Sequence, residues 1–565
     1  DMARRRTGRG RSLVCGVVLA LAGALAAVPA PSAGAASAAE GAPDGCQEPV
    51  RPASQMRVEP CDSPDRIIEK AAKTVPTAAQ LAWQQREVTA FTHFGMNTFT
   101  DREWGSGAED RALFDPRHLD FDQWMRAYKA AGAEQVMLTA KHHDGFTLWP
   151  SRYTGHSVKN SPYGRDIVGQ YVRAARKAGL KVGVYLSPAD GAELPHGWHK
   201  KWLARLAAKQ EAGEPLTTVE RTALEDGGPP AGRGRYGNGS APRTRTIPTL
   251  VPGDDRARAV AQGRLPSFRV KVDDYDAYYL NQVYEIVTQY GPLDELWLDG
   301  ANPWRDAGVT QEYGWQEIFR ALHLMAPGTP VFGGPQGVRW VGNERGVARE
   351  SEWSATPSAV DPWTAYAGGL PNDSTDEDIG SRARLLDGSV RYLQWYPAEA
   401  DVSIRPGWYH HPGQRPKSAA ELLDLYEKSV GRNASLLLNV PPGRDGRIDP
   451  ADVAELTAFG KAVRRIYGTD VRAAGGAGTG GPYTFDRVVL GEDLRAGQRV
   501  ERFTVEARQD GRWRRIALGT TVGHRRILAL PAPVTADRVR VRVLESRAEP
   551  RLRPVTLHRW RPAVR

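Results

Sequence analysis

The chain has 565 residues, of which 25% are charged and 41% hydrophobic, and its formal net charge is +10 at pH 7. This length exceeds what one hydrophobic core usually supports, so we expect a large domain and at least one smaller one. The arginines are scattered along the chain rather than gathered in one stretch, which argues against a nucleic-acid-binding protein despite the basic charge.

Residues 1–38 have the pattern of a secretory signal peptide. A head with five arginines precedes the apolar run SLVCGVVLALAGALAAV, and small residues then offer cleavage after Ala35 or Ala38. The run is too short and wrongly flanked for a spanning helix. We therefore expect a secreted, extracellular protein without a membrane attachment once the signal is removed.

Cys46 and Cys61 are the two cysteines that follow the predicted signal peptide. In an oxidising compartment a disulfide between them is the default interpretation. It would tie down a Pro-rich N-terminal segment, residues 39–64, and would have no chemical role.

Strand-like and helical runs alternate between residue 65 and about residue 470. The strand-like runs are 87–95, 134–146, 181–188, 295–300, 330–334 and 434–442, and the helical runs are 119–133, 166–180, 276–291 and about 311–325. Near-continuously apolar strands that alternate with helices indicate a parallel sheet covered by helices. There are too many units for a small open sheet, so we predict an α/β fold, a (β/α)8-type (TIM-like) barrel, with its chemistry at the carboxyl ends of the strands.

Three further segments differ in composition from the barrel. Residues 195–270 are rich in Pro, Gly and Arg, and we expect an extended loop over the barrel mouth, although solvent-exposed padding fits nearly as well. Residues 471–482 have the composition of a flexible Gly-rich linker. Residues 483–565 alternate apolar and charged residues over short spans, which predicts a small all-β sandwich.

The segment ELWLDG, residues 295–300, predicts a short buried strand that ends in a carboxylate. Taken alone, Asp299 is better explained by capping of the next turn. Trp297 before it and ANPW after it favour a functional site at this strand end.

The segment AKHHDGFTLW places His142 and His143 at the end of another predicted strand. They could be metal ligands, a hydrogen-bonding clamp or a structural pair. A zinc site needs a third ligand, and although His93 is available, no ligand spacing supports one. Hydrogen bonding to a polyol fits better, because imidazole can both donate and accept, and we predict no metal and no cofactor.

His93, Glu103 and Trp104 follow the first predicted strand of the barrel. Together they would put His, Glu and Trp side chains at one rim, which is typical of a monosaccharide pocket. The 16 tryptophans of the chain also suit flat, amphipathic ligands, although filling a large core is an equally frequent use.

A glycosidase needs a second carboxyl group that protonates the leaving oxygen. Downstream of Asp299 the candidates are Glu344 in a Gly-rich segment, and Glu350 and Glu352 in RESEW. The residue types alone do not choose among the three.

Several motifs together carry a resemblance to a known family. AFTHFGMNTFTDREWG, AKHHDGFTLWPS, GVYLSPAD, LDELWLDGA, WVGNERG and LLLNVPPGRDGRI resemble the glycoside hydrolase family 29 α-L-fucosidases over residues 65–470. They are most similar to the branch selective for α-1,3- and α-1,4-linked fucose on branched glycans. The tail resembles the discoidin-like, carbohydrate-binding jelly-roll domain often appended in that branch.

The resemblance implies an α-L-fucosidase of the retaining type that acts on fucosylated oligosaccharides or glycoconjugates without a cofactor. Asp299 corresponds to the nucleophile and Glu344 to the acid/base of the family motifs. The pocket residues carried over are His93, Glu103, Trp104, His142, His143 and Trp297. Leu186 stands where broader-specificity relatives have a second Tyr, and Tyr185 is kept as a weaker candidate.

Two alternatives stay open from the sequence. One is a broad-specificity α-L-fucosidase that also accepts α-1,2-linked or aryl fucosides. The other is a fucose-binding protein with little catalysis, against which the presence of both Asp299 and Glu344 argues.

Overall fold

The structure is a computed structural model that describes residues 46–194, 198–216, 220–221, 224, 240–303, 305, 311–370, 377–474 and 481–560. The predicted signal peptide and residues 475–480 of the predicted linker lie outside the described residues. None of the helices described in these ranges is long and apolar enough to cross a membrane.

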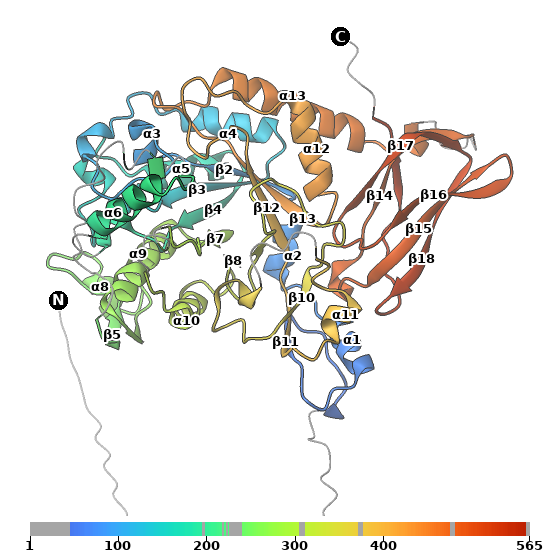
Figure 1. Cartoon of the computed structure of the whole chain (residues 1–565), viewed down its shortest axis with the longest axis horizontal. Helices are drawn as coiled ribbons and strands as arrows, with labels where there is room; N and C mark the ends of the chain where they lie inside the picture. Colours follow the sequence, from blue (N-terminus) through green and yellow to red (C-terminus); the bar gives the residue numbers. More distant parts are fainter. Residues whose placement is uncertain are drawn as a thin grey trace, which may run out of the picture. The chain divides into compact units, whose positions relative to one another are not determined.

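An eight-stranded parallel sheet forms the centre of the larger domain (Figure 1). In spatial order its strands are β8 (Val331–Phe332), β7 (Glu295–Trp297), β4 (Lys181–Leu186), β3 (Gln135–Lys141), β2 (Val88–Thr92), β13 (Ala434–Asn439), β12 (Ala398–Ser403) and β9 (Arg339–Trp340). A parallel bridge between Phe332 and Val338 brings the two edge strands together, so the sheet nearly closes into a barrel. The predicted fold class is confirmed.

Helices cover the outside of this sheet (Figure 1). They are α4 (Phe121–Ala130), α5 (Ile167–Lys177), α9 (Asp274–Tyr290), α10 (Trp315–Met325), α12 (Ala419–Ser429) and α13 (Pro450–Tyr467). Strands such as β3 are buried at every residue because helices cover one face and side chains fill the barrel on the other. This double burial is why the strands are recognisable in the sequence as apolar runs.

The repeat of strand and helix is broken between β8 and β9, which are joined by residues 333–338 without a helix. The sequence analysis predicted neither β9 nor β12. Strand β12 reads AEADVS, and its polar side chains Glu399, Asp401 and Ser403 are buried. A strand with alternate polar residues inside a barrel has the sequence pattern of a half-exposed strand, so it gave no barrel signal.

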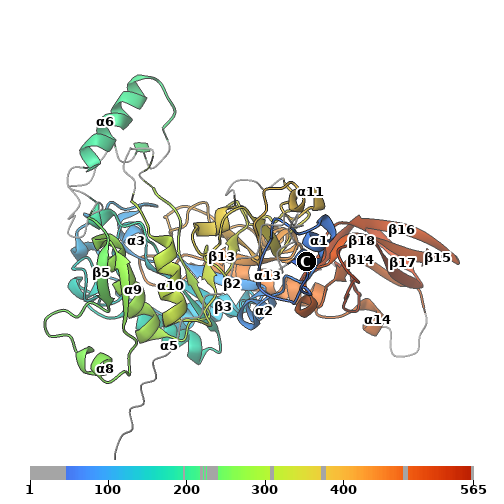
Figure 2. The same cartoon turned by 90° about the horizontal axis from the view of Figure 1, so that it is seen from below.

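The predicted loop over residues 195–270 contains regular structure, so that prediction is wrong for the described part. Helix α6 (Trp198–Glu211) stands away from the barrel helices in Figure 2, and α8 (Ala257–Ala261) follows further along. Strands β5 (Arg243–Ile247) and β6 (Phe268–Val272) form an antiparallel pair. The pair is stable because Ile247, Val270 and Val272 join the main hydrophobic core.

The N-terminal segment is attached to the barrel domain by a strand and is closed on itself by a disulfide. Strand β1 (Gln55–Arg57) pairs with β11 (Tyr392–Trp395), which also pairs with β10 (Ala355–Ser358). Cys46 and Cys61 are joined in a disulfide with a Cα–Cα distance of 6.1 Å. The bond closes residues 46–61 into a loop before helix α1 (Pro64–Ala72).

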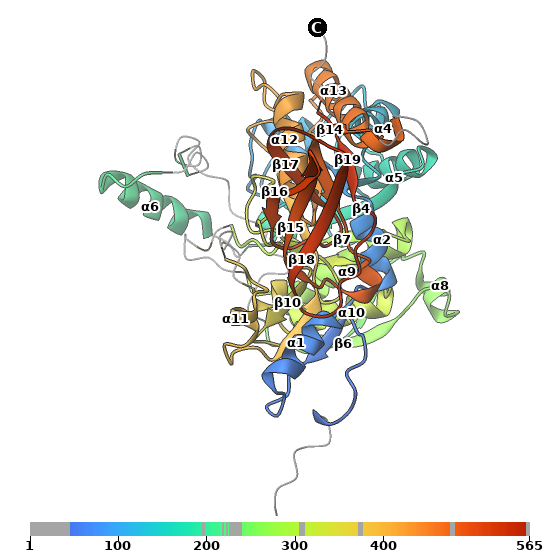
Figure 3. The same cartoon turned by 90° about the vertical axis from the view of Figure 1, so that its right-hand side faces the viewer.

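The C-terminal residues form two antiparallel sheets, as predicted (Figure 3). One contains β17 (Arg526–Ala536), β14 (Tyr483–Leu490) and β19 (Thr556–His558), and the other β16 (Arg512–Gly519), β15 (Val500–Gln509) and β18 (Arg538–Ser546). Their inner faces share a hydrophobic core that includes Phe485, Phe503 and Val505. Residues 471–474 of the predicted linker are helical rather than extended.

Candidate active site

Asp299 lies just beyond the carboxyl end of β7 and is held by groups from neighbouring strands. The hydroxyl of Tyr185 on β4 donates to Oδ2 at 2.9 Å, and the main-chain N–H of Ala301 donates to Oδ1 at 2.8 Å. Nε2 of His143, which follows β3, lies 3.6 Å from Oδ2. The carboxylate is therefore fixed in orientation and remains partly exposed, with 22% of the side-chain surface open.

The glycine after Asp299 is required by a close approach of Tyr366. The Tyr366 hydroxyl donates to the carbonyl of Leu298 at 2.7 Å, and its ring packs between the ends of β7 and β8. A Cβ at Gly300 would lie 2.2 Å from this ring, and one at Gly333 would lie 2.1 Å from it. Side chains at these two positions would displace Tyr366 and with it the strand end that carries Asp299.

Trp297 lies under the site as part of an aromatic stack inside the barrel. Its ring lies 3.9 Å from that of Phe332 and 5.0 Å from that of Tyr185, at interplanar angles of 16° and 26°. Its Nε1 donates to Oε2 of Glu399 at 2.9 Å. Burial, and then the charge of the neighbouring Glu295, raise the pKa of Glu399 well above its usual range. The stacked rings and the Nε1 hydrogen bond together fix the orientation of the Trp297 side chain.

Three histidines, His93, His142 and His143, lie close to one another beside Asp299. Ring centroids of His93 and His142 are 5.6 Å apart, and those of His142 and His143 are 4.3 Å apart. Burial lowers the pKa of all three rings, that of His93 to about 4. The rings are therefore neutral at pH 7 and each can accept a hydrogen bond as well as donate one. In the described part of the chain, no three His, Cys, Asp or Glu side chains are grouped so that they could hold a metal ion.

Glu103 and Trp104 lie on the same side of the barrel mouth but differ in their contacts. Glu103 accepts hydrogen bonds from the main-chain N–H groups of Trp408 and Tyr409 at 2.9 and 3.3 Å, and its Oε1 lies 2.5 Å from Nε2 of His411. Its carboxylate thus holds the segment 407–411 in place. Trp104 is 37% exposed and its ring lies 5.8 Å from that of His143, so it can form one wall of a pocket.

Glu344 follows β9 in an exposed turn. Although the residue is exposed, partial removal of its carboxyl group from water and then the charge of Asp299 raise the pKa of Glu344 above its usual range, while a hydrogen bond from the Trp408 side chain opposes the rise. The two carboxyl groups are thus close enough for the ionised one to favour a proton on the other.

The other two candidate glutamates are engaged elsewhere. Glu352 is buried between Arg339 and Arg349. Glu350 pairs with Arg432 and with Arg526 of β17. Both therefore have structural ion pairs that Glu344 lacks among the described residues.

Sequence reasoning missed the segment RPGWYHHPG, residues 405–413, and Asn439. Trp408 and Tyr409 surround His93, with ring centroids 5.1 and 5.4 Å away. Asn439 accepts from His93 and ends β13. The adjacent aromatic and histidine residues of the segment were a usable signal, whereas one Asn after an apolar run was not.

Residues 71–468 match the family model described as alpha-L-fucosidase. The chain belongs to the α-L-fucosidase family. It is a glycoside hydrolase of family 29, as the motifs predicted.

Known members of this family are similar over most of the chain. The α-L-fucosidase 1 of Arabidopsis thaliana is 30% identical over 525 residues, which cover 84% of this chain and 86% of the plant protein. A solved structure of a protein from Bacteroides ovatus has 34% sequence identity to this chain and a TM-score of 0.70. The match covers 91% of this chain and 78% of the Bacteroides protein. A glycoside hydrolase 29 family member from an unknown rumen bacterium is 32% identical with a TM-score of 0.62, over 86% and 77% of the two chains.

Proposed function

We propose that this α-L-fucosidase acts by a retaining double displacement, with Asp299 as nucleophile and Glu344 as acid/base. The observation that carries the proposal is the placement of Asp299, whose carboxylate is held at the end of β7 by Tyr185 and the Ala301 N–H. The pKa of Glu344 is raised, by partial removal from water and then by the charge of Asp299. A carboxylate beside a carboxyl group with a raised pKa is the arrangement that nucleophilic glycoside cleavage needs.

In the first step Asp299 Oδ attacks C1 of fucose and the bond from C1 to the glycosidic oxygen breaks. Glu344 gives its proton to that oxygen, so the aglycone leaves as a neutral alcohol. In the second step Glu344, now ionised, takes a proton from water as the water oxygen attacks C1 and releases Asp299. Tyr185 and the Ala301 N–H hold the carboxylate for the first attack.

The pocket beside Asp299 suits a 6-deoxy sugar. His93, His142 and His143 present ring nitrogens for the hydroxyl groups, while Trp104 and Trp297 offer apolar surface for the C5 methyl group. The retaining mechanism is tested by following the anomer first released by NMR and by trapping a 2-fluorofucosyl adduct. Release of the inverted sugar, or an adduct on a residue other than Asp299, would overturn it.

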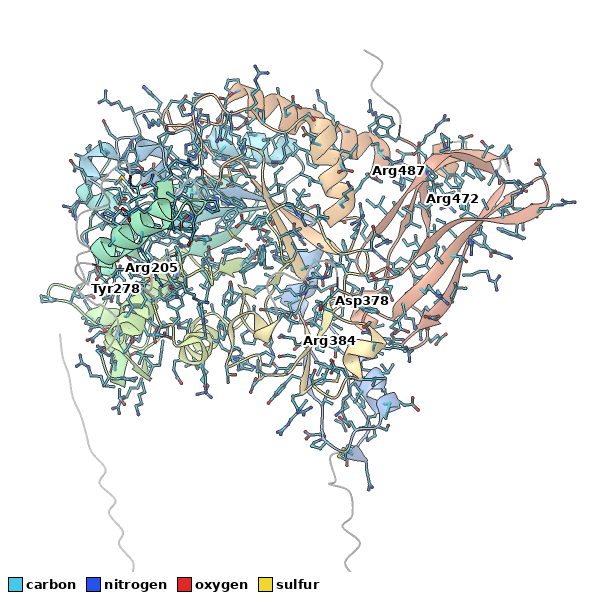
Figure 4. The ribbon with its side chains drawn as sticks, in the orientation of Figure 1. Arg205, Tyr278, Asp378, Arg384, Arg472 and Arg487 are labelled. Carbon is cyan, nitrogen blue, oxygen red and sulfur yellow. A yellow bond between two sulfur atoms is a disulfide. The ribbon has the colours of Figure 1, made fainter. Side chains whose placement is uncertain are left out.

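We further propose that the substrate is fucose α-1,3- or α-1,4-linked within a branched glycan. A cavity of about 320 Å³ is lined by Asn343 and Arg345, the two chain neighbours of Glu344, and by Glu377 and Asp378 (Asp378 is labelled in Figure 4). Glu344 itself does not line this cavity. A second branch bound there would contact both neighbours of Glu344, so that its binding energy also orders the turn that carries the acid/base.

The linkage is tested by comparing kcat/KM on a Lewis-type trisaccharide with that on 2'-fucosyllactose. Arg345→Ala should lower kcat/KM for the branched substrate several-fold more than for an aryl fucoside, because only the former reaches the cavity. Equal values on the two oligosaccharides would indicate the broad-specificity alternative, and no released fucose from any substrate would indicate a binding protein.

Two further features belong to the same proposal. The leader pattern supports export of the enzyme, which N-terminal sequencing of the secreted protein would test. The two C-terminal antiparallel sheets support the assignment of residues 483–565 to a discoidin-like domain, which the sequence of the tail resembles.

A further inference from the structure

Asn439, the last residue of β13, uses both ends of its side-chain amide. Its nitrogen donates to the carbonyl of Trp408 and to Oγ of Ser403, both at 2.8 Å. Its oxygen accepts from the main-chain N–H of His93 at 3.2 Å. A carbonyl can only accept and a main-chain N–H can only donate, so these contacts fix which end of the amide is the oxygen.

The amide oxygen fixed in this way lies 2.8 Å from Nδ1 of His93. Because an amide oxygen can only accept, Nδ1 of His93 must carry a proton. Burial lowers the pKa of His93 to about 4, so the ring is neutral at pH 7 and has only this one N–H. Nε2 is consequently left with a lone pair.

Nε2 of His93 is not among the fully enclosed, unpaired polar atoms of the described residues, so it keeps some surface that a ligand can contact. Within the described ranges no protein group forms a hydrogen bond with this atom, and the charges of Glu103 and Asp299 both act on the ring. The ring is 4% exposed and is surrounded by the rings of Phe91 and Trp408, at 4.4 and 5.1 Å. A nearly buried acceptor without an internal donor costs free energy unless a bound group donates to it.

We propose that Asn439 is a positioning residue that holds His93 as the Nδ1–H tautomer, so that Nε2 only accepts a hydrogen bond, from one hydroxyl of the bound fucose. The role of this hydroxyl rests on the proposed function, in which His93 lines the fucose pocket. A hydroxyl normally both donates and accepts, and this contact uses it as a donor. A fluorine at the same carbon can accept but cannot donate, so it cannot replace that hydroxyl.

The tautomer is tested directly by nitrogen NMR on the full-length protein labelled with ¹⁵N-histidine, with His93→Gln identifying the signals of His93. At pH 7 the wild type should show a protonated Nδ1 and an unprotonated Nε2. Asn439→Asp places a carboxylate beside Nδ1 and should convert the ring to the doubly protonated form. Ser403→Ala is the matched control, because it removes a partner of the amide nitrogen and leaves the oxygen on Nδ1. A wild-type ring protonated on Nε2 would overturn the proposal.

The direction of the ligand hydrogen bond is tested with monodeoxy and monofluoro fucosides as competitive inhibitors. At one ring position, both replacements should weaken binding to the wild type by the same factor, about two- to tenfold. In Asn439→Asp the fluoro compound at that position should recover most of this loss, because Nε2 then donates. Fluoro compounds that bind the wild type as well as the parent fucoside at every position would overturn this part.

The two experiments separate the inference from the proposed function. If the protein released no fucose, the proposed mechanism would fail while the NMR spectra still decided the tautomer. If the protein released fucose but the NMR spectra showed His93 protonated on Nε2, the proposed mechanism would stand and only the inference would fail.

Discussion

Replacement of Glu344 by alanine should remove general acid catalysis without harming the fold. The side chain is exposed, and within the described residues it forms no ion pair, so the expected loss of folding stability is within about 0.5 kcal/mol. A positioned general acid contributes about 10²- to 10⁴-fold to rate. At 1.36 kcal/mol for each tenfold change, this is about 2.7–5.5 kcal/mol of transition-state stabilisation for a leaving group that needs a proton.

The assay compares kcat/KM on an oligosaccharide and on an aryl fucoside with an acidic phenol as the leaving group. Glu344→Ala should lose about 10²- to 10⁴-fold on the oligosaccharide and far less on the aryl fucoside, because a phenolate leaves without protonation. Azide should restore turnover and yield fucosyl azide.

Glu350→Ala is the matched control for this series, since Glu350 lies six residues away and pairs with Arg432 and Arg526. It should change the rate on the aryl fucoside less than twofold and should give no fucosyl azide, while its effect on a branched oligosaccharide reports on the cavity that Glu350 also lines. An equal loss on the two substrates in Glu344→Ala, or fucosyl azide formed by Glu350→Ala, would refute the assignment.

Three further outcomes are expected. Asp299→Ala should lower kcat by at least about four orders of magnitude with an unchanged circular dichroism spectrum, and near-normal turnover in the folded variant would exclude Asp299 as nucleophile. Glu352→Ala should lower the free energy of unfolding in urea by about 3–5 kcal/mol, because it removes the carboxylate that is paired with the buried Arg339, and a loss below about 1 kcal/mol would contradict this. Hydrogen bonding to Glu103 raises the pKa of His411 in the folded protein. The protonated His411 ring therefore contributes fully to stability below about pH 6.5, and this contribution is lost as the pH rises through the raised pKa of the folded state. Tm should therefore fall more over that range in the wild type than in His411→Gln, and equal slopes would show that the ring contributes nothing.

The sequence by itself determined six of the eight described barrel strands and the position of the nucleophile candidate. Strands buried on both faces are apolar along their length, and β3 and β7 can be recognised without knowing their neighbours. Asp299 could be placed at a strand end because ELWLDG changes from apolar to polar within one residue.

The tertiary structure decided which partners the polar residues meet. Glu103 and Trp408 are 305 positions apart, and their contact exists only because the barrel brings the ends of β2 and β12 together. The choice of Glu344 over Glu352 as the acid/base depends in the same way on a tertiary contact. Arg339 forms a buried ion pair with Glu352, so that carboxylate already has a structural partner.

The C-terminal arginines show the same division between sequence and structure. In the sequence they are scattered, but the register of β15 with both of its neighbours places Arg515 and Arg540 opposite Glu506. Alternation along a strand is local and can be read from the sequence. Which strands pair, and in which register, depends on long-range packing that a local pattern does not encode.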